Sequence, residues 1–187
     1  MIRLATSRDA SAIHAIYAPI VRDTFISFEL DVPPVGEIER RIASTVARFP
    51  WLAFEDGEGL AGYAYAGEHR ERAAYQWSVD VSCYVHERAR RRGIGARLYR
   101  ALLRILARQG FTNAFAGIAL PNPGSVAMHA SVGFVELGRY RDVGFKAGAW
   151  HDTVWMQRRL AEPSARPSAP RPLASMPARE IEEAIGA

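Results

Sequence analysis

The chain has 187 residues, 49% of them hydrophobic, which is enough for one domain with a substantial core. Its formal charge of +4 suits a protein that meets phosphates but is too modest to indicate nucleic-acid binding by itself. The single cysteine, Cys83, excludes an internal disulfide and a cysteine-rich metal site, and we expect no metal. No apolar stretch approaches the roughly 18 residues of a membrane span, so we expect a cytoplasmic protein without membrane contact.

The first half of the chain alternates short strands with helices. Residues 6–9 have the form of a capping box and are expected to open a helix after a strand at 2–5. An irregular loop then carries Phe25 and Phe28, and such a loop often covers a site, although both side chains could equally be core anchors. The next predicted elements are a helix at 37–49, a hairpin of strands at 51–55 and 60–66, and a strand at 75–85.

A basic, glycine-rich loop separates the strand at 75–85 from the following helix. Gly93 and Gly95 let the backbone approach an anion closely, and the helix start behind them presents unpaired N–H groups. The pattern predicts a pyrophosphate cradle, although arginine-rich turns are often only solvated surface. After this loop we expect a helix at 97–109, a strand at 112–120, a short helix beginning at Asn122, and antiparallel strands at 135–145 and 152–160.

These elements predict a mixed α/β domain over residues 1–160. The connection from the strand at 79–85 through a helix to the strand at 112–120 is expected to be parallel and right-handed. From 161 to 187 the composition shifts to Pro, Ala, Ser and Arg, which predicts a flexible tail that cannot bury a core. Residues 180–185 could still form one helical turn against a partner.

The glycine-rich loop and a later segment resemble the GNAT superfamily of N-acetyltransferases. The family pattern Arg/Gln-x-x-Gly-x-Gly/Ala corresponds to the loop 90–95, and the pattern Asn-x-x-Ala/Ser-x-x-x-Tyr-x-x-x-Gly-Phe corresponds to residues 122–134. The resemblance implies the GNAT acyl-CoA N-acyltransferase fold, a mostly antiparallel sheet with one splayed parallel pair and flanking helices. It also implies acetyl-CoA as the acetyl donor. The cofactor-binding residues would be Cys83, Tyr84, Val85, Arg90, Arg91, Arg92, Gly93, Ile94, Gly95, Asn122, Ser125 and Ser131.

Asp80 and His129 are the candidates for proton transfer. His129 stands where the family pattern has a tyrosine that protonates the departing thiolate, and imidazole titrates near neutrality. Asp80 lies on a strand between two valines, so it needs a partner or a wet cleft. It could accept the proton of a substrate ammonium or form a salt bridge to Arg70 or Arg72. A structural histidine is the alternative for His129, and Cys83 is expected to pack rather than to act as a nucleophile.

Further segments are similar to the phosphinothricin and methionine sulfoximine N-acetyltransferases, most specifically Gly-Phe-Lys-x-Gly-x-Trp-x-Asp at 144–152. That subfamily pairs a glutamate on this strand with a histidine on this helix, which matches Asp80 and His129; the shorter aspartate favours a bridging water. The resemblance implies a homodimer that acetylates the α-amine of a small amino-acid analogue. Candidates for holding that substrate are Phe28, Arg70, Arg72, Tyr75 and Lys146.

Three other functions stay open at this point. The acceptor could be a different amine, such as a peptide N-terminus, a polyamine or an antibiotic. The arginines between 88 and 108 could bind nucleic acid, which predicts salt-sensitive affinity and no thioester turnover, although we expect no nucleic-acid partner. An acetyl-CoA sensor would bind the cofactor without releasing free thiol.

Overall fold

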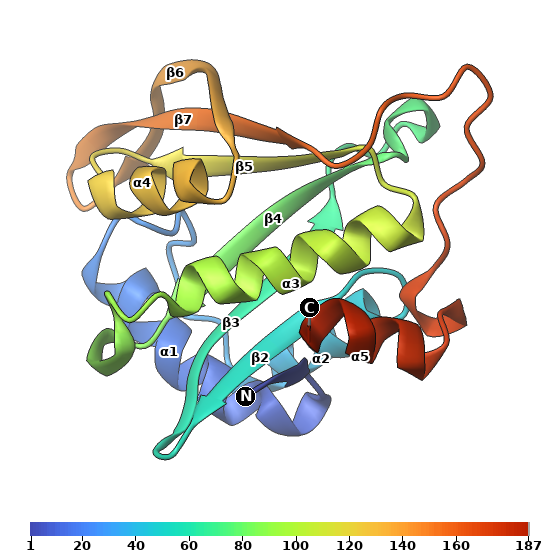
Figure 1. The fold of residues 1–187 in the computed structure, drawn as a ribbon. Helices are drawn as coiled ribbons and strands as arrows, with labels where there is room; N and C mark the ends of the chain where they lie inside the picture. Colours follow the sequence, from blue (N-terminus) through green and yellow to red (C-terminus); the bar gives the residue numbers. More distant parts are fainter. Residues whose placement is uncertain (187) are drawn as a thin grey trace.

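The computed structural model describes residues 1–186 and contains one seven-stranded sheet with helices on both faces (Figure 1). The strand order is β1-β2-β3-β4-β5-β7-β6, and only β4 and β5 are parallel neighbours in this described range. The strands are β1 Ile2–Leu4, β2 Trp51–Asp56, β3 Gly59–Glu68, β4 Ser78–Val85, β5 Asn113–Ala119, β6 Val135–Lys146 and β7 Ala149–Arg159. The helices are α1 Ala10–Asp23, α2 Val35–Val46, α3 Ile94–Gln109, α4 Pro123–Ser131 and α5 Ala178–Gly186. This architecture confirms the predicted fold.

Two hydrophobic cores lie on opposite faces of the sheet. On one face, the apolar side of α3 packs against alternate residues of β4, so that Leu98, Val79 and Val81 are buried together. On the other face, Ile13 of α1 and Ile42 of α2 cover the aromatic residues of β2 and β3. The period-two alternation of each strand therefore decides which residues face which helix layer.

The parallel pair of strands is joined over a short distance only. β4 and β5 are in register from Ser78 opposite Asn113 to Asp80 opposite Phe115. Beyond Asp80, β4 stays paired with β3, and β5 stays paired with β7. The facing edges of β4 and β5 therefore separate toward their carboxyl ends, which is the splay that the resemblance implied.

The chain beyond residue 160 differs from its prediction. Composition indicated a segment unable to contribute to a core, yet Leu173, Met176, Ile181 and Ala184 are buried in the cluster around α3. Figure 1 shows α5 lying beside α3. The helix is short and amphipathic, and a proline-rich stretch precedes it. Its few apolar residues give a weak periodic signal, so the composition of the whole segment predicted a flexible tail instead.

Arginines of α3 hold α5 in place. Arg104 Nε donates to the carbonyl of Ala184 over 2.6 Å, and Arg108 Nη1 donates to the carbonyl of Glu180 over 2.5 Å. The last carbonyls of a helix lack intrahelical partners and carry partial negative charge, so the Arg104 guanidinium stabilises that of Ala184, whereas Arg108 reaches the first turn of the helix at Glu180. These two arginines thus have partners within the chain.

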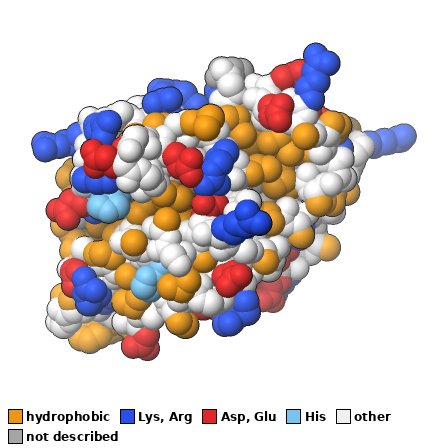
Figure 2. Space-filling model, turned by 90° about the horizontal axis from the view of Figure 1, so that it is seen from below, with side chains coloured by type: hydrophobic (Ala, Val, Ile, Leu, Met, Phe, Trp, Pro, Cys, Tyr) orange, Lys and Arg blue, Asp and Glu red, His pale blue; other side chains and the backbone are white. Residues whose placement is uncertain are grey.

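Positively and negatively charged side chains are intermixed on the face of the molecule drawn in Figure 2. Arg88 pairs with Asp56 through Nη1 and Oδ2, 2.9 Å apart, near the start of α3. Figure 2 shows lysine and arginine side chains beside acidic ones, with apolar side chains between them. Among residues 1–186, no helix is both long and apolar enough to cross a bilayer.

Candidate active site

A cavity of about 590 Å³ opens where β4 and β5 separate, between the start of α3 and α4. Its lining contains every predicted cofactor-binding residue except Arg92. These are Cys83, Tyr84, Val85, Arg90, Arg91, Gly93, Ile94, Gly95, Asn122, Ser125 and Ser131. Arg92 instead lies 3.5 Å from Asp56, measured from Nη1 to Oδ2. Residues from three separate parts of the chain therefore converge on one cavity.

The start of α3 has the backbone geometry of an anion site. Gly93 precedes the helix in the left-handed conformation, with φ of 73°, and no atom lies within 4 Å of a Cβ added there. A residue with a side chain would be strained at this φ, which explains the glycine. The N–H groups of the first helical turn have no intrahelical acceptors, so they and the neighbouring arginines favour a phosphate group.

Cys83 lies at the wall of this cavity but is a poor nucleophile. Burial raises the pKa of the Cys83 thiol to about 12. The thiolate is the reactive form of cysteine, and at neutral pH almost none of it would exist here. The structure thus supports packing as the role of this side chain. Cys83 Sγ lies close to the backbone of Gly95, where it would contact an added Cβ.

His129 is buried on α4 with a partner at each ring nitrogen. Its Nδ1 lies 2.7 Å from the carbonyl of Ser125, which can only accept, so Nδ1 carries the proton. Nε2 lies 3.0 Å from the hydroxyl of Tyr99, which therefore donates. Burial lowers the pKa of His129, so the imidazole is neutral at pH 7. Tyr99 was missed by the sequence analysis, because its position on α3 follows the ordinary apolar spacing of a core residue.

Asp80 has a partner that the sequence analysis also missed. Its Oδ1 lies 2.6 Å from Nδ1 of His69, which follows the end of β3. The pKa of Asp80 is raised because burial disfavours the carboxylate, while the hydrogen bond from His69 acts in the opposite direction. Arg70 and Arg72, the partners considered from sequence, make no direct ion pair with Asp80 within the described chain.

Asp80 and His129 lie on opposite faces of the sheet. Val79 and Val81, which flank Asp80, point into the core beneath α3, so Asp80 points to the face of α1 and α2. His129 contacts Tyr99, a residue of the core on the α3 side. The structure therefore brings each residue to the opening between β4 and β5 but does not bring the two into contact.

Three of the five predicted substrate-binding residues share one open groove of about 710 Å³. Arg70, Arg72 and Tyr75 line it together with His69. The other lining residues, Glu68 and Glu71, give the groove both signs of charge. At its edge Trp155 has a buried indole N–H without a hydrogen-bond partner among residues 1–186, and its ring lies 6.3 Å from that of His69.

Lys146 does not serve this groove, which corrects the prediction. Its buried ammonium donates three hydrogen bonds of 2.7 Å, to the carbonyls of Val21, Ser27 and Glu29. An ammonium has three N–H donors, so none remains for a substrate anion. Lys146 instead fastens the loop after α1 to the end of β6.

Phe28 also lies away from the groove. Its ring packs directly on the backbone of Gly144, where an added Cβ would collide with it. The same ring lies 6.4 Å from that of His151, measured between centroids. The glycine of the 144–152 motif is therefore explained by this close approach, and Phe28 joins the loop to the hairpin of β6 and β7.

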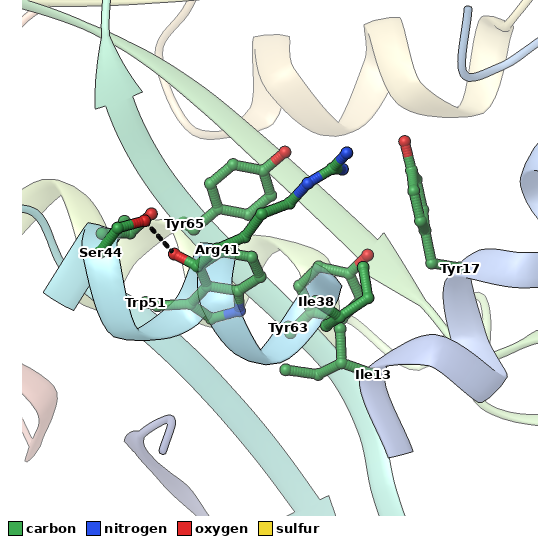
Figure 3. Close-up of a pocket in the computed structure, with 9 residues that line it drawn as sticks. Ile13, Tyr17, Ile38, Arg41, Ser44, Trp51, Tyr63 and Tyr65 are labelled. Atoms are coloured by element: carbon green, nitrogen blue, oxygen red, sulfur yellow. Dashed lines mark hydrogen bonds between the residues drawn. The ribbon is translucent and has the colours of Figure 1, made fainter. Parts of the chain in front are cut away.

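A smaller cavity of about 150 Å³ lies between α1, α2 and the aromatic residues of β2 and β3. Figure 3 shows that the guanidinium of Arg41 and the hydroxyls of Tyr17 and Tyr65 point to the same side. Arg41 is neutralised, because Glu29 Oε1 and Glu37 Oε1 each lie 2.7 Å from its nitrogens. This cavity consequently lacks the free positive charge that an anionic ligand would need.

A sheet whose single parallel pair separates above a glycine-led helix start defines the class of acyl-CoA N-acyltransferases. The sequence comparison agrees, because the family model of the acetyltransferase (GNAT) domain matches residues 2–155. The chain belongs to the GNAT acetyltransferase family.

Curated relatives and solved structures cover most of the chain. A phosphinothricin N-acetyltransferase of Streptomyces viridochromogenes is 36% identical, over 92% of this chain and 92% of its own. An L-methionine sulfoximine/L-methionine sulfone acetyltransferase of Salmonella typhimurium is 32% identical, over 88% of this chain and 96% of its own. A phosphinothricin acetyltransferase of Sinorhizobium meliloti, crystallised with acetyl-CoA, superimposes with a TM-score of 0.86 at 34% identity, covering 90% of this chain and 92% of the other.

Proposed function

We propose that this protein transfers the acetyl group of acetyl-CoA to the α-amine of a small amino-acid analogue of the phosphinothricin, methionine sulfoximine or methionine sulfone type. The observation that carries the proposal is that the cofactor cavity lies at the opening between β4 and β5, while the groove contains His69, the hydrogen-bond partner of Asp80 at the last paired position before that opening. The cofactor cavity lies on the side of α3 and α4, and the groove of Arg70 and Arg72 lies beside Asp80 on the other side. The names of the relatives support the choice of acceptor.

The donor fits the residues of the cavity. Arg90, Arg91 and the N–H groups at the start of α3 would hold the pyrophosphate. The edge of β4 from Cys83 to Val85 has no partner on the β5 side, so its backbone is free to pair with an amide-containing arm. A backbone N–H aimed at the developing oxyanion is worth roughly 3–4 kcal/mol in such reactions. Bound acetyl-CoA supplies the activated acetyl group.

The acceptor fits the mixed charge of the groove. Arg70 and Arg72 would bind the substrate carboxylate, and Tyr75 would offer a hydroxyl to its polar head. Glu68 and Glu71 keep the groove from being purely cationic, which suits a zwitterion. A polyamine would instead require an acidic funnel, and two arginines at the groove would repel it.

We propose that the departing thiolate is protonated on the side of the sheet where His129 lies. Both ring nitrogens of His129 already have partners, so the imidazole would act through a neighbour. The hydroxyl of Ser125 lies 3.4 Å from Nδ1 and also lines the cofactor cavity. In this proposal Ser125 delivers its proton to the sulfur and regains one from the second proton that the acceptor nitrogen loses. The N–H of His129 Nδ1 orients the serine hydroxyl, and Tyr99 holds the imidazole ring.

A thiol-release assay tests the proposed function. Wild-type protein with acetyl-CoA should release free thiol in the presence of phosphinothricin, methionine sulfoximine or methionine sulfone, and His129→Ala should lower kcat by about 10²-fold. Spermidine and a peptide with a free N-terminus serve as comparison acceptors. Turnover with either comparison acceptor but with none of the amino-acid analogues would contradict the proposal, as would cofactor binding without any thiol release.

A substitution at Gly93 tests the placement of the pyrophosphate. Gly93→Asp should abolish acetyl-CoA binding in calorimetry, because it places a carboxylate beside the phosphates. Gly93→Ala is the matched control: it carries the same strain at positive φ, about 1 kcal/mol, without the charge. Acetyl-CoA affinity that is equal in the two variants would argue against this placement.

A further inference from the structure

We propose that His69 is the general base that takes the proton from the acceptor's ammonium group, and that Asp80 is a positioning residue that acts through it. This inference rests on the proposed function. It replaces the direct or water-bridged role that the sequence predicted for Asp80, and it assigns the role to a side chain that no motif identified.

The geometry of the pair carries the inference. An ionised carboxylate only accepts hydrogen bonds, so the 2.6 Å contact makes Nδ1 of His69 the donor to Asp80. Nε2 is then the unprotonated nitrogen, and it has no hydrogen-bond partner among residues 1–186. His69 lines the groove of Arg70 and Arg72, so this free nitrogen belongs to a residue of the proposed acceptor site. A carboxylate that fixes the tautomer of an imidazole is a recurrent arrangement for a general base.

The ring of His69 is also held in place by packing. It stacks on Phe115 with centroids 4.3 Å apart and an interplanar angle of 17°. Tyr75 meets its edge at 6.0 Å, and the His69 side chain is only 12% exposed. A base must be within hydrogen-bond reach of the proton it removes, and a fixed ring keeps Nε2 in one position.

The pair explains how an aspartate suffices at this position. The side chain of aspartate is one methylene shorter than that of the glutamate which the resemblance implied. Asp80 and Ser82 are successive residues on one face of β4. Ser82 lines a further cavity of about 50 Å³ between β4 and β5, which His129 also lines. An imidazole bonded to Asp80 extends the reach of the carboxylate into the groove without a water molecule.

The charged groups that face His69 come from β4 and from the segment that follows β3. From β4 it meets Asp80, whereas β5 and β7 contribute only the aromatic rings of Phe115 and Trp155. The remaining charged or titratable groups come from the end of β3 and the segment after it: Glu68, Arg70, Glu71, Arg72 and Tyr75. The negative charges of Glu68 and Glu71 balance the positive charges of Arg70 and Arg72. The carboxylate of Asp80 is then the one charge facing the ring that these groups leave unbalanced.

The step conserves protons and electrons. Nε2 of His69 takes one proton from the ammonium and later returns it to solvent. The lone pair of the resulting amine forms the N–C bond with the thioester carbonyl carbon, and the C–S bond breaks with its electrons on sulfur. The second proton lost by the nitrogen ends on that sulfur, giving the amide and free coenzyme A.

The test measures kcat and KM from about pH 6 to about pH 9 for wild type, His69→Phe, Asp80→Asn and the double variant, with His14→Gln as a control on α1. Phenylalanine retains the stacking on Phe115. His69→Phe should lower kcat at neutral pH by about 10²-fold, with a deficit that shrinks as rising pH frees the amine. Its KM for acetyl-CoA should stay within about twofold of wild type. Asp80→Asn should lose less, and the double variant no more than His69→Phe.

Two results would overturn the assignment. One is His69→Phe with wild-type kcat and an unchanged pH profile; the other is losses that add in the double variant, since Asp80 would then act by itself. Nitrogen NMR of the wild-type protein gives an independent readout: we expect His69 with its proton on Nδ1, and a proton on Nε2 at high pH contradicts the proposal. If the wild type acetylates none of the amino-acid analogues, the proposed function fails, whereas the NMR result still judges the hydrogen-bonded pair.

Discussion

Desolvation acts on several ionisable side chains of this protein, with different results that depend on their partners. Burial raises the pKa of Cys83 and Asp80 and lowers that of His129 and Lys146. Cys83 has no partner and stays a neutral thiol. Lys146 stays charged because three carbonyls accept its hydrogen bonds. The chemistry available to each residue thus follows from its neighbours as much as from its type.

The state of Cys83 leads to a prediction about the reaction. Cys83→Ala should retain kcat within about threefold of wild type, because a thiol with so high a pKa does not form a covalent acyl intermediate. Mass spectrometry of wild-type protein mixed with acetyl-CoA alone should find no acetylated Cys83. Loss of all turnover in Cys83→Ala, with acetyl-CoA affinity retained, would favour a covalent mechanism.

The ion pair between Arg3 and Asp9 predicts a pH dependence of stability. Arg3 donates to both carboxylate oxygens, over 2.6 and 2.8 Å, and these hydrogen bonds lower the pKa of Asp9. A carboxyl with a depressed folded-state pKa stabilises the fold above its unfolded pKa of about 3.9 and loses that contribution as the pH falls further. Asp9→Asn should therefore be less stable than wild type at neutral pH, and the difference should shrink below about pH 4.

Denaturant unfolding at several pH values measures this difference. The matched control is Asp23→Asn, whose partner Arg22 is adjacent in sequence and exposed, and whose effect should be small at every pH. If the stability difference between Asp9→Asn and wild type stayed constant through the acid range, the ion pair between Arg3 and Asp9 would not be its cause.

At this scale the sequence motifs predicted which residues line the cavity beside α3 better than they predicted the partners of Asp80 and His129. The residues from Gly93 to Gly95 and from Asn122 to Ser125 belong to continuous motifs whose spacing directs them to one anion site. His69 and Tyr99 belong to no motif and gain their partners only through the tertiary fold. Lys146 stands within a specific motif, but no sequence pattern indicates that its ammonium turns toward the loop after α1.

Within residues 1–160, hydrophobic periodicity predicted the helices and strands correctly, while the ends of these elements depended on local backbone geometry. The helix predicted at 97–109 begins at Ile94, because Gly93 provides the left-handed turn before it. The strand predicted at 75–85 begins at Ser78, since Ala73–Tyr75 forms a 3₁₀ turn. That turn orients Tyr75 into the groove with Arg72, so the unpredicted boundary has consequences for the site.

The helix α5 gives a prediction at this scale. Ile181→Ala should lower the free energy of unfolding by about 2–4 kcal/mol, because it leaves a cavity in the core beside α3. Glu182→Ala, at an exposed neighbouring position on the same helix, should change it by less than about 0.5 kcal/mol. Urea unfolding measures both. Equal stability of Ile181→Ala and wild type would mean that α5 does not remain packed in solution.

For the whole molecule, the sheet separates two kinds of recognition. One face, with α3 and α4, carries the backbone N–H groups and arginines that we propose for the donor, and the other face carries the mixed charges of the groove proposed for the acceptor. The pairing of β4 and β5 ends at Asp80, and the opening between the two strands begins beyond it. Sequence reasoning anticipated the opening through the family resemblance, but it could not place Asp80 and His129 on different faces, because strand and helix packing decide that together.

We propose that the protein is a homodimer that buries the hairpin of β6 and β7. β6 is an edge strand of the sheet, and its backbone is free on one side. The hairpin exposes an unusual set of large apolar side chains: Val135, Leu137, Tyr140, Val143, Phe145 and Trp150. A second copy of the same surface would cover both the apolar groups and the edge.

Sedimentation velocity tests the assembly. The wild type should sediment as a dimer, and Phe145→Glu combined with Trp150→Glu should shift it to a monomer, because charges would enter an apolar interface. Val35→Glu introduces a single glutamate at an exposed apolar residue of α2 and should leave the dimer intact. A wild-type monomer, or a dimer that tolerates the paired glutamates, would place any interface elsewhere.

The three hydrogen bonds of Lys146 have a mechanical consequence. They tie the stretch that contains Ile26, part of the wall around the donor, to the end of β6, within the surface expected to meet the second copy. A displacement of that hairpin would therefore pull on the wall of the cavity through a single ammonium. Assembly of two copies would therefore make the wall of the proposed donor cavity more rigid in each copy.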